Sequence, residues 1–249
     1  MNKKEIFSKV LDGFETEEMR LYCEDMIEQM PDYIFTIPSS TSYKYHNATQ
    51  CQPGGQIYHI IMVCTIMNYI LNLEYIKKKW PEPKRRDCLR IAACLHDAIK
   101  CGWDGSAYTV HEHPILASAW IQNTVVEHDI KSGLKKYIGR LVESHSGEWT
   151  SSKKSKVVLP EPENDEQFLV HLCDYLGSRS NLDMIYTDEE KDAISGAQEP
   201  VEPSEVVMRF GKYKGKKLGE TPVDYLLWCK TSLSLNEPIK SAIEVLIKQ

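Results

Sequence analysis

The segment IAACLHDAIK, residues 91–100, constrains the fold of this chain more than any other stretch of its sequence. Its apolar residues follow the spacing of a helix that fills a protein core. His96 and Asp97 interrupt this pattern, and an imidazole or a carboxylate without a partner is costly to bury. Two explanations fit the pair alone: a hydrogen-bonded core histidine beside an aspartate on the exposed side of the helix, or a pair that binds a ligand.

Helical periodicity continues over most of the first 180 residues, where alternating, strand-like stretches are few. It predicts an all-α domain, and Pro114 suits the first turn of one of its helices. If residues 86–100 form one helix, His96 and Lys100 share a face, and Asp97 lies about 100° around the axis. The expected helices span residues 3–13, 15–29, 56–79, 86–100, 114–125, 132–145 and 166–180.

A change in composition near residue 200 predicts a domain over residues 1–186, an acidic linker over 187–206 and a small basic module over 207–249. The net charge of the chain is −6, yet residues 201–249 hold eight Lys or Arg against six Asp or Glu. Glycines at positions 211, 215 and 219 predict a short hairpin before a helix that starts near Pro222. The module is therefore expected to be an α+β appendage.

Other bulk features exclude several classes of protein. The longest apolar stretch, residues 57–73, contains His59 and two asparagines, so no membrane span is expected. The N-terminus is charged and amphipathic, which favours a cytoplasmic protein over a secreted one. The eight cysteines form no C-x-x-C pair, and free core thiols are favoured over a disulfide framework or a zinc ribbon.

Further histidines and an aspartate lie in apolar surroundings. His59 follows a Gly-Gly bend at the start of an apolar helix, His113 precedes Pro114, His145 continues an apolar stripe, and Asp174 interrupts another apolar helix. Without partners, these buried groups would be strongly destabilising, whereas one bound metal centre compensates them together. The sequence therefore favours a metal site in the core of a helical bundle.

The order of these residues resembles the H…HD…H…H…D signature of the HD superfamily of metal-dependent phosphohydrolases. YHNATQCQPGGQIYH resembles the segment that opens this domain in HD-type exoribonucleases, and HDAIK, HPILAS and SHSGEW resemble other parts of the pattern. The resemblance covers about residues 40–180. It implies an all-α HD-domain helical bundle.

The resemblance also implies two divalent metal ions that share Asp97. Mixed imidazole and carboxylate ligands favour Mn, Fe, Co or Ni over Mg, and the spacing does not choose among these four metals. Such a pair would activate a bridging hydroxide for attack on phosphorus. The implied ligands are His59, His96, Asp97 and Asp174 for one ion, and Asp97, His113 and His145 for the other.

Two basic residues are candidates for binding the substrate. Lys100, one turn after His96, is placed to contact a phosphate oxygen or to assist the leaving group. The alternative is that it is a surface lysine at the end of a helix. Arg179, five residues after Asp174, is a second candidate for binding phosphate.

For one of the remaining histidines the sequence indicates a surface position, and for the others it leaves two explanations open. His128–Asp129 is a second His–Asp pair, but its charged neighbours favour a solvated position. His111 is an alternative to His113 as a ligand. His171 is either a partner of the ligands or a core residue, and His46 either contacts substrate or caps a helix.

The function that the resemblance favours is hydrolysis of a phosphodiester, because two-metal members of the superfamily are more often phosphodiesterases or nucleases. The expected substrate is a nucleic acid or a nucleotide-derived ester. The alternatives are a nucleotidase or a (d)NTP phosphohydrolase on the same scaffold, and a nucleic-acid-binding protein with a structural metal site.

The basic module bears on this choice. It resembles a small unit, F-G-K-x-K-G-x-x-L…P-x-D-Y-L-x-W, of phage and bacterial proteins and of the ends of some exonucleases. Its cations alternate with aromatic residues, a pattern suited to single-stranded nucleic acid, although packing or dimerisation would also explain it. The candidate contacts are Arg209, Lys212, Lys214, Lys216 and Lys217.

Overall fold

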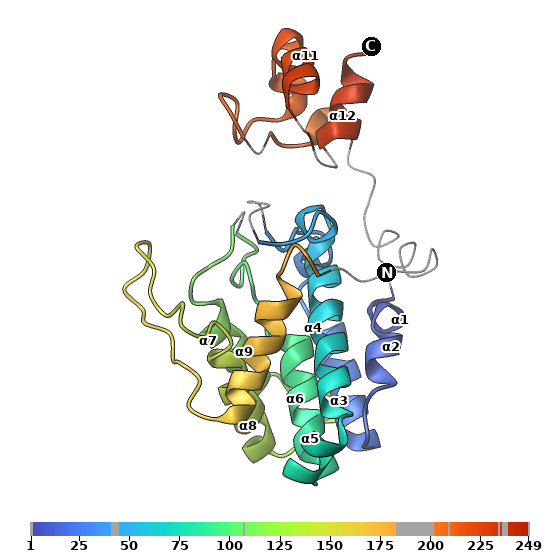
Figure 1. Ribbon diagram of the computed structural model, residues 1–249, viewed down its shortest axis with the longest axis vertical. Helices are drawn as coiled ribbons and strands as arrows, with labels where there is room; N and C mark the ends of the chain where they lie inside the picture. The colour runs from blue at the N-terminus through green and yellow to red at the C-terminus, as the bar shows by residue number, and fades with distance from the viewer. Residues whose placement is uncertain are drawn as a thin grey trace.

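The computed structural model describes residues 2–40, 45–106, 108–182, 202–208, 210–233, 235 and 239–248. The all-α prediction for the first part of the chain is confirmed, and Figure 1 shows its longer helices running side by side. These helices are α1 (Lys3–Ile6), α2 (Ser8–Leu11), α3 (Glu17–Glu28), α4 (Gly55–Leu71), α5 (Glu74–Lys79), α6 (Pro83–Leu95), α7 (His113–Asn123), α8 (Ser132–Glu143) and α9 (Asp165–Gly177), with short 3-10 turns η1 (Asp32–Phe35) and η2 (Thr49–Cys51).

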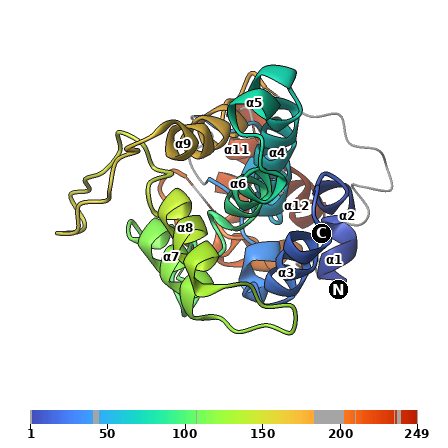
Figure 2. The ribbon, with the colours of Figure 1, turned by 90° about the horizontal axis from the view of Figure 1, so that it is seen from below.

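Helix α6 forms the centre of the bundle. Every residue from Arg86 to Leu95 is buried, because α6 packs against α3, α4, α8 and α9, which surround it in Figure 2. A helix that is enclosed in this way places whatever follows it deep inside the protein. His96 and Asp97 follow it directly and are both buried.

The polar residues of α6 form ion pairs that join it to α3. The Asp87 carboxylate accepts hydrogen bonds from the backbone N–H of Thr16 at 2.9 Å and from the Thr16 hydroxyl at 2.7 Å, at the start of α3. Arg86 and Arg90 both bond the Glu15 carboxylate. These contacts fix the register of α6 against α3 at the end opposite the His–Asp pair.

Several predicted helices are shorter than expected. The helix over 3–13 is interrupted at Phe7, and the one over 56–79 divides between Leu71 and Glu74. The prediction of one helix over 86–100 was wrong, because α6 begins at Pro83, whose fixed φ suits a first turn, and ends at Leu95. Residues 96–100 instead form turns, in which the Ala98 amide bonds the Leu95 carbonyl.

The basic module has a small hydrophobic cluster of its own, formed by residues between Val206 and Ile247. The predicted hairpin is reduced to one antiparallel bridge between Val207 and Lys217, because Gly211 and Gly215, both with positive φ, turn the chain twice between them. The module contains η3 (Pro203–Glu205), η4 (Leu218–Glu220), α11 (Val223–Ser232), which follows Pro222 as predicted, and α12 (Ile239–Leu246). Of the predicted linker, residues 187–201 lie outside the described residues.

All eight cysteines are buried and free of disulfides, in agreement with the prediction of core thiols. Within the described part of the chain, no helix combines the length and apolar character needed to cross a membrane.

Candidate metal centre

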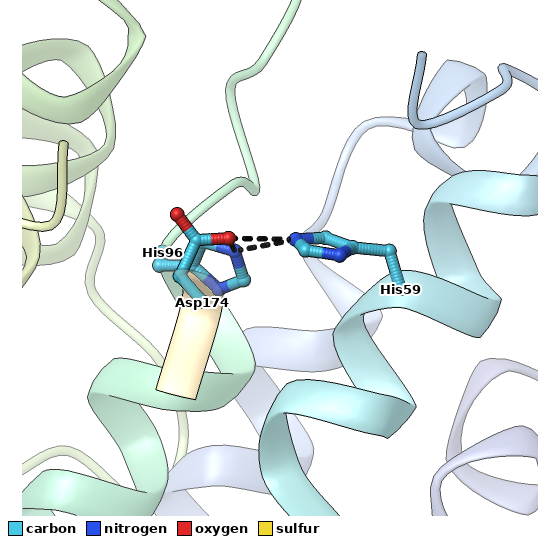
Figure 3. A group of neighbouring side chains, drawn as sticks. All are labelled: His59, His96 and Asp174. Carbon is cyan, nitrogen blue, oxygen red and sulfur yellow. Dashed lines mark hydrogen bonds and ion pairs between the residues drawn. The ribbon is translucent and has the colours of Figure 1, made fainter. Parts of the chain in front are cut away.

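Two groups of metal-ligating side chains meet where the bundle helices end. In the first group, His59 from α4, His96 just after α6 and Asp174 from α9 point toward one another (Figure 3). In the second, Asp97 meets His113, the first residue of α7, and His145, which lies two residues after α8. Within each group, one ligand atom per residue lies within 4.8 Å of the others.

Short distances join the atoms of the first group. His59 Nε2 lies 3.0 Å from Asp174 Oδ1 and 3.3 Å from His96 Nε2, and His96 Nε2 lies 3.7 Å from Asp174 Oδ1. The Gly54-Gly55 sequence makes this possible, since Gly54 has φ of 74° and a Cβ on Gly55 would lie 2.1 Å from the Gln50 carbonyl oxygen. This close approach of the preceding backbone to α4 explains why two glycines precede His59 in the sequence.

Asp97 places one carboxylate oxygen on each group. Its Oδ1 lies 3.0 Å from His113 Nε2 and 3.7 Å from His145 Nε2. Its Oδ2 lies 3.4 Å from His96 Nε2 and 3.7 Å from His59 Nε2. One carboxylate thus faces both groups of candidate ligands.

The hydrogen bonds of the imidazoles test whether the residues fit a metal. His96, His113 and His145 each donate Nδ1–H to the backbone carbonyl three residues earlier, at 2.8, 2.7 and 2.7 Å. A carbonyl only accepts, so in a neutral ring the Nε2 atom carries a lone pair. The Nε2 atoms of His113 and His145 nevertheless lie 3.1 Å apart. Two lone pairs at this distance repel unless a proton or a metal ion lies between them, and Nδ1–H bonds to carbonyls are typical of metal-ligating histidines.

The protonation states of the site also suit metal binding. Burial lowers the pKa of His145 to about 3 and also lowers the pKa of His59. Burial opposes ionisation of Asp97, but Lys100 and the imidazoles outweigh it and hold the Asp97 pKa well below its usual range. For His96, burial lowers the pKa, yet Asp97 and Asp174 raise it overall, so the carboxylates favour positive charge at this point. A divalent cation bound there would supply that charge.

Lys100 and Gln56 both bond Oδ2 of the Asp97 carboxylate. The buried Lys100 ammonium donates to Asp97 Oδ2 at 2.6 Å, and the Gln56 amide donates to the same oxygen at 3.0 Å. Lys100 thus contacts Asp97 directly, rather than ending a helix on the surface. Gln56 was missed by the sequence analysis, although its position three residues before His59 places both on one face of α4.

Both groups open into one cavity of about 560 Å³. The cavity wall also includes His46, whose ring centre lies 5.5 Å from that of His59, and Arg179. Among the predicted residues that line it are His59, Asp97, Lys100, His113, His145 and Asp174.

The other histidines lie outside the two groups. His171 donates from Nδ1 to the His145 carbonyl at 2.9 Å and so supports the turn that carries His145. His111 bonds the Val157 carbonyl, and His128 lies half-exposed on Asp25. The structure thus brings His113, and not His111, to the site.

Four of the five cations predicted to bind nucleic acid are exposed in the basic module. They are Lys212, Lys214, Lys216 and Lys217. Lys217 pairs with Glu205 at 2.5 Å, and the Lys212 ammonium lies 5.4 Å from the centre of the Tyr213 ring. Arg209 lies outside the described residues.

The fold and the site agree with the comparison to known families. Residues 57–178 match the family described as HD domain, and this segment contains all six implied ligands. The match does not extend to the basic module. No curated protein and no solved structure matches the chain.

Proposed function

We propose that this protein is a metal-dependent phosphohydrolase that uses two divalent ions. The observation that carries the proposal is the pair of opposed Nε2 atoms of His113 and His145, 3.1 Å apart, beside a carboxylate shared with the first group. An HD domain with only the first group would have no need of this second cluster. His59, His96, Asp97 and Asp174 would hold one ion, and Asp97, His113 and His145 the other.

Two ions bound there would lower the pKa of a bound water and neutralise charge on the phosphate oxygens. The protein's own part is to keep Asp97 ionised and oriented, which the bonds from Lys100 and Gln56 accomplish. Lys100 also lines the cavity, so we assign its ammonium to a phosphate oxygen of the substrate. Asp97 and Lys100 are therefore the residues on which catalysis depends most.

The proposed reaction is hydrolysis of a phosphodiester in a nucleic acid or a nucleotide-derived substrate. Two features support it: the second metal group, and the exposed lysines of the basic module, which suit a single strand. A nucleotidase or (d)NTP phosphohydrolase on the same scaffold is the alternative. A purely structural metal site is disfavoured, since structural sites are closed, whereas these ligands line an open cavity.

The test is a substrate panel with protein reconstituted separately with Mn, Fe, Co and Ni. The panel contains single-stranded DNA, RNA, a cyclic dinucleotide, dNTPs, dNMPs and bis(p-nitrophenyl) phosphate. We expect hydrolysis of diesters. Hydrolysis confined to monophosphates or triphosphates would replace the diesterase by the alternative, and no hydrolysis with any metal would contradict the phosphohydrolase itself.

A further inference from the structure

An aromatic wall stands beside the metal ligands in the same cavity. The rings of Trp149 and Tyr175 stack with 5.8 Å between their centres and 8° between their planes, and both line the cavity. Trp149 is 53% exposed, although an indole is among the most favourable side chains to bury. A large flat ring that is held in place but left uncovered offers a surface for a second flat ring.

The wall is fixed to the ligands by the covalent chain. Trp149 follows His145 by four residues through a turn in which Gly147 has φ of 60°. A Cβ on Gly147 would lie 2.2 Å from His171 Cε1, so this turn requires glycine. Tyr175 directly follows Asp174. The distance from the stacked rings to both metal groups is therefore set by the fold.

Arg179 determines which flat group suits the wall. Its guanidinium carbon lies 4.1 Å from the centre of the Tyr175 ring and 5.2 Å from that of Tyr45. Its Nε donates to the Tyr175 carbonyl at 3.1 Å, and its Nη2 to the Ser178 hydroxyl at 2.9 Å. A cation already occupies the tyrosine rings, so a cationic ligand is disfavoured, whereas a neutral planar ring beside a phosphate group is favoured.

We propose that Trp149, supported by Tyr175, binds the nucleobase of a nucleotide whose phosphate group lies on the metal centre. This inference rests on the proposed function, and it makes Trp149 a specificity-determining residue. A cavity of about 560 Å³ is within the range typical of small-molecule sites. Stacking of one base on an aromatic side chain changes affinity by roughly tenfold or more.

The test compares a thymidine 5′-phosphate ester with the ester that carries a methoxy group in place of the base. Both the methyl diester and the monoester are used, because neither has an aromatic leaving group that would compete for the wall. Phosphorus NMR measures their hydrolysis. For the wild type we expect kcat/KM to be roughly tenfold or more higher with the base than without it. Trp149→Ala should remove this preference, so that kcat/KM becomes similar on the two esters, whereas Trp149→Phe should retain most of the preference.

Binding provides a second readout that does not depend on turnover. A thymidine 5′-phosphonate, in which a P–C bond resists hydrolysis, should quench tryptophan fluorescence in the wild type. Trp149→Phe should still bind the phosphonate by calorimetry but lose the quenching, and Trp149→Ala should bind it roughly tenfold more weakly. Trp228→Ala, which removes a tryptophan of similar exposure, 49%, from the basic module, is the matched control and should behave as the wild type.

The results separate this inference from the proposed function. Equal rates on the two esters, with equal binding by wild type and Trp149→Ala, would overturn the base subsite while leaving the phosphohydrolase intact. If no ester is hydrolysed but the phosphonate still quenches Trp149 and depends on it for affinity, the subsite stands and the proposed reaction fails.

Discussion

At the scale of single residues, Asp97 is the side chain on which both metal groups depend. We predict that Asp97→Ala loses both ions and at least tenfold in activity, because Asp97 places one carboxylate oxygen on each group. Metal analysis of the purified variant, together with turnover, checks this. Asp129→Ala, in the second His–Asp pair, is the control and should keep full metal content.

The second metal group gives a separate prediction. His113→Ala and His145→Ala should each lose one ion and stay folded, because the four ligands of the first group remain. Metal content and circular dichroism, with His111→Ala as the control, measure both effects. Two ions per chain with normal turnover in either variant would contradict the assignment of the second ion to His113 and His145.

The sequence revealed these residues but not their arrangement. Apolar surroundings mark His59, His145 and Asp174 as costly to bury, so the ligand types could be inferred from pattern alone. The tautomers of the imidazoles could not be inferred, because each tautomer depends on a backbone carbonyl whose position follows from where a helix ends. Gln56 was missed for a similar reason: a buried amide is recognised only once its acceptor, Asp97, is known to lie beside it.

At the scale of helices, three of the ligands, His96, Asp97 and His145, lie just past the points where α6 and α8 end. Helix α6 ends at Leu95 and α8 at Glu143, so His96 and His145 lie in turns that direct their rings into the cavity. The helical periodicity predicts that both helices continue through these histidines, because neither glycine nor proline marks the end. The first glycines with positive φ after these helices, Gly102 and Gly147, come several residues after Leu95 and Glu143.

The junction of α3 with α6 makes stability depend on pH. Hydrogen bonds from Arg86, opposed by partial burial, lower the Glu15 pKa from 4.5 to about 2. A carboxyl group whose pKa is lower in the folded state stabilises the fold above the unfolded pKa, and this stabilisation is lost as the pH falls toward the folded value. At about 1.4 kcal/mol per pKa unit, Glu15 contributes about 3 kcal/mol above pH 5.

We therefore predict that Glu15→Gln lowers the free energy of unfolding by about 3 kcal/mol near neutral pH. The difference from wild type should shrink as the pH falls from about 4.5 toward 2. Denaturant titrations at several pH values measure this difference. A gap that stays constant with pH would mean that the ion pairs with Arg86 and Arg90 do not set the Glu15 pKa.

At the scale of the whole molecule, the described residues form two hydrophobic clusters, one from the bundle and one from the basic module. The sequence predicted the helical class because periodicity reports burial directly, and it located the change in composition near residue 200. The strand pairing in the basic module was harder to predict, since glycine-rich turns specify a change of chain direction but not the length of the strands on either side.

If the basic module binds nucleic acid, its affinity for a single strand should depend measurably on salt. If Lys212, Lys214, Lys216 and Lys217 contact the backbone of a single strand, binding should weaken with salt by a log–log slope of about −0.7 per phosphate contacted. Changing all four to Ala should weaken strand binding and flatten that slope, while hydrolysis of bis(p-nitrophenyl) phosphate stays unchanged. Unchanged affinity and slope would assign the module to assembly instead.

The number of metal ions per chain tests the central claim most directly. Wild-type protein should be stripped with a chelator, reconstituted with Mn, freed of excess metal by gel filtration and analysed by plasma mass spectrometry. Because Asp97 directs one oxygen to each of two histidine groups, we predict two ions per chain. A content that saturates at one ion or fewer would contradict the two-metal centre and the mechanism built on it.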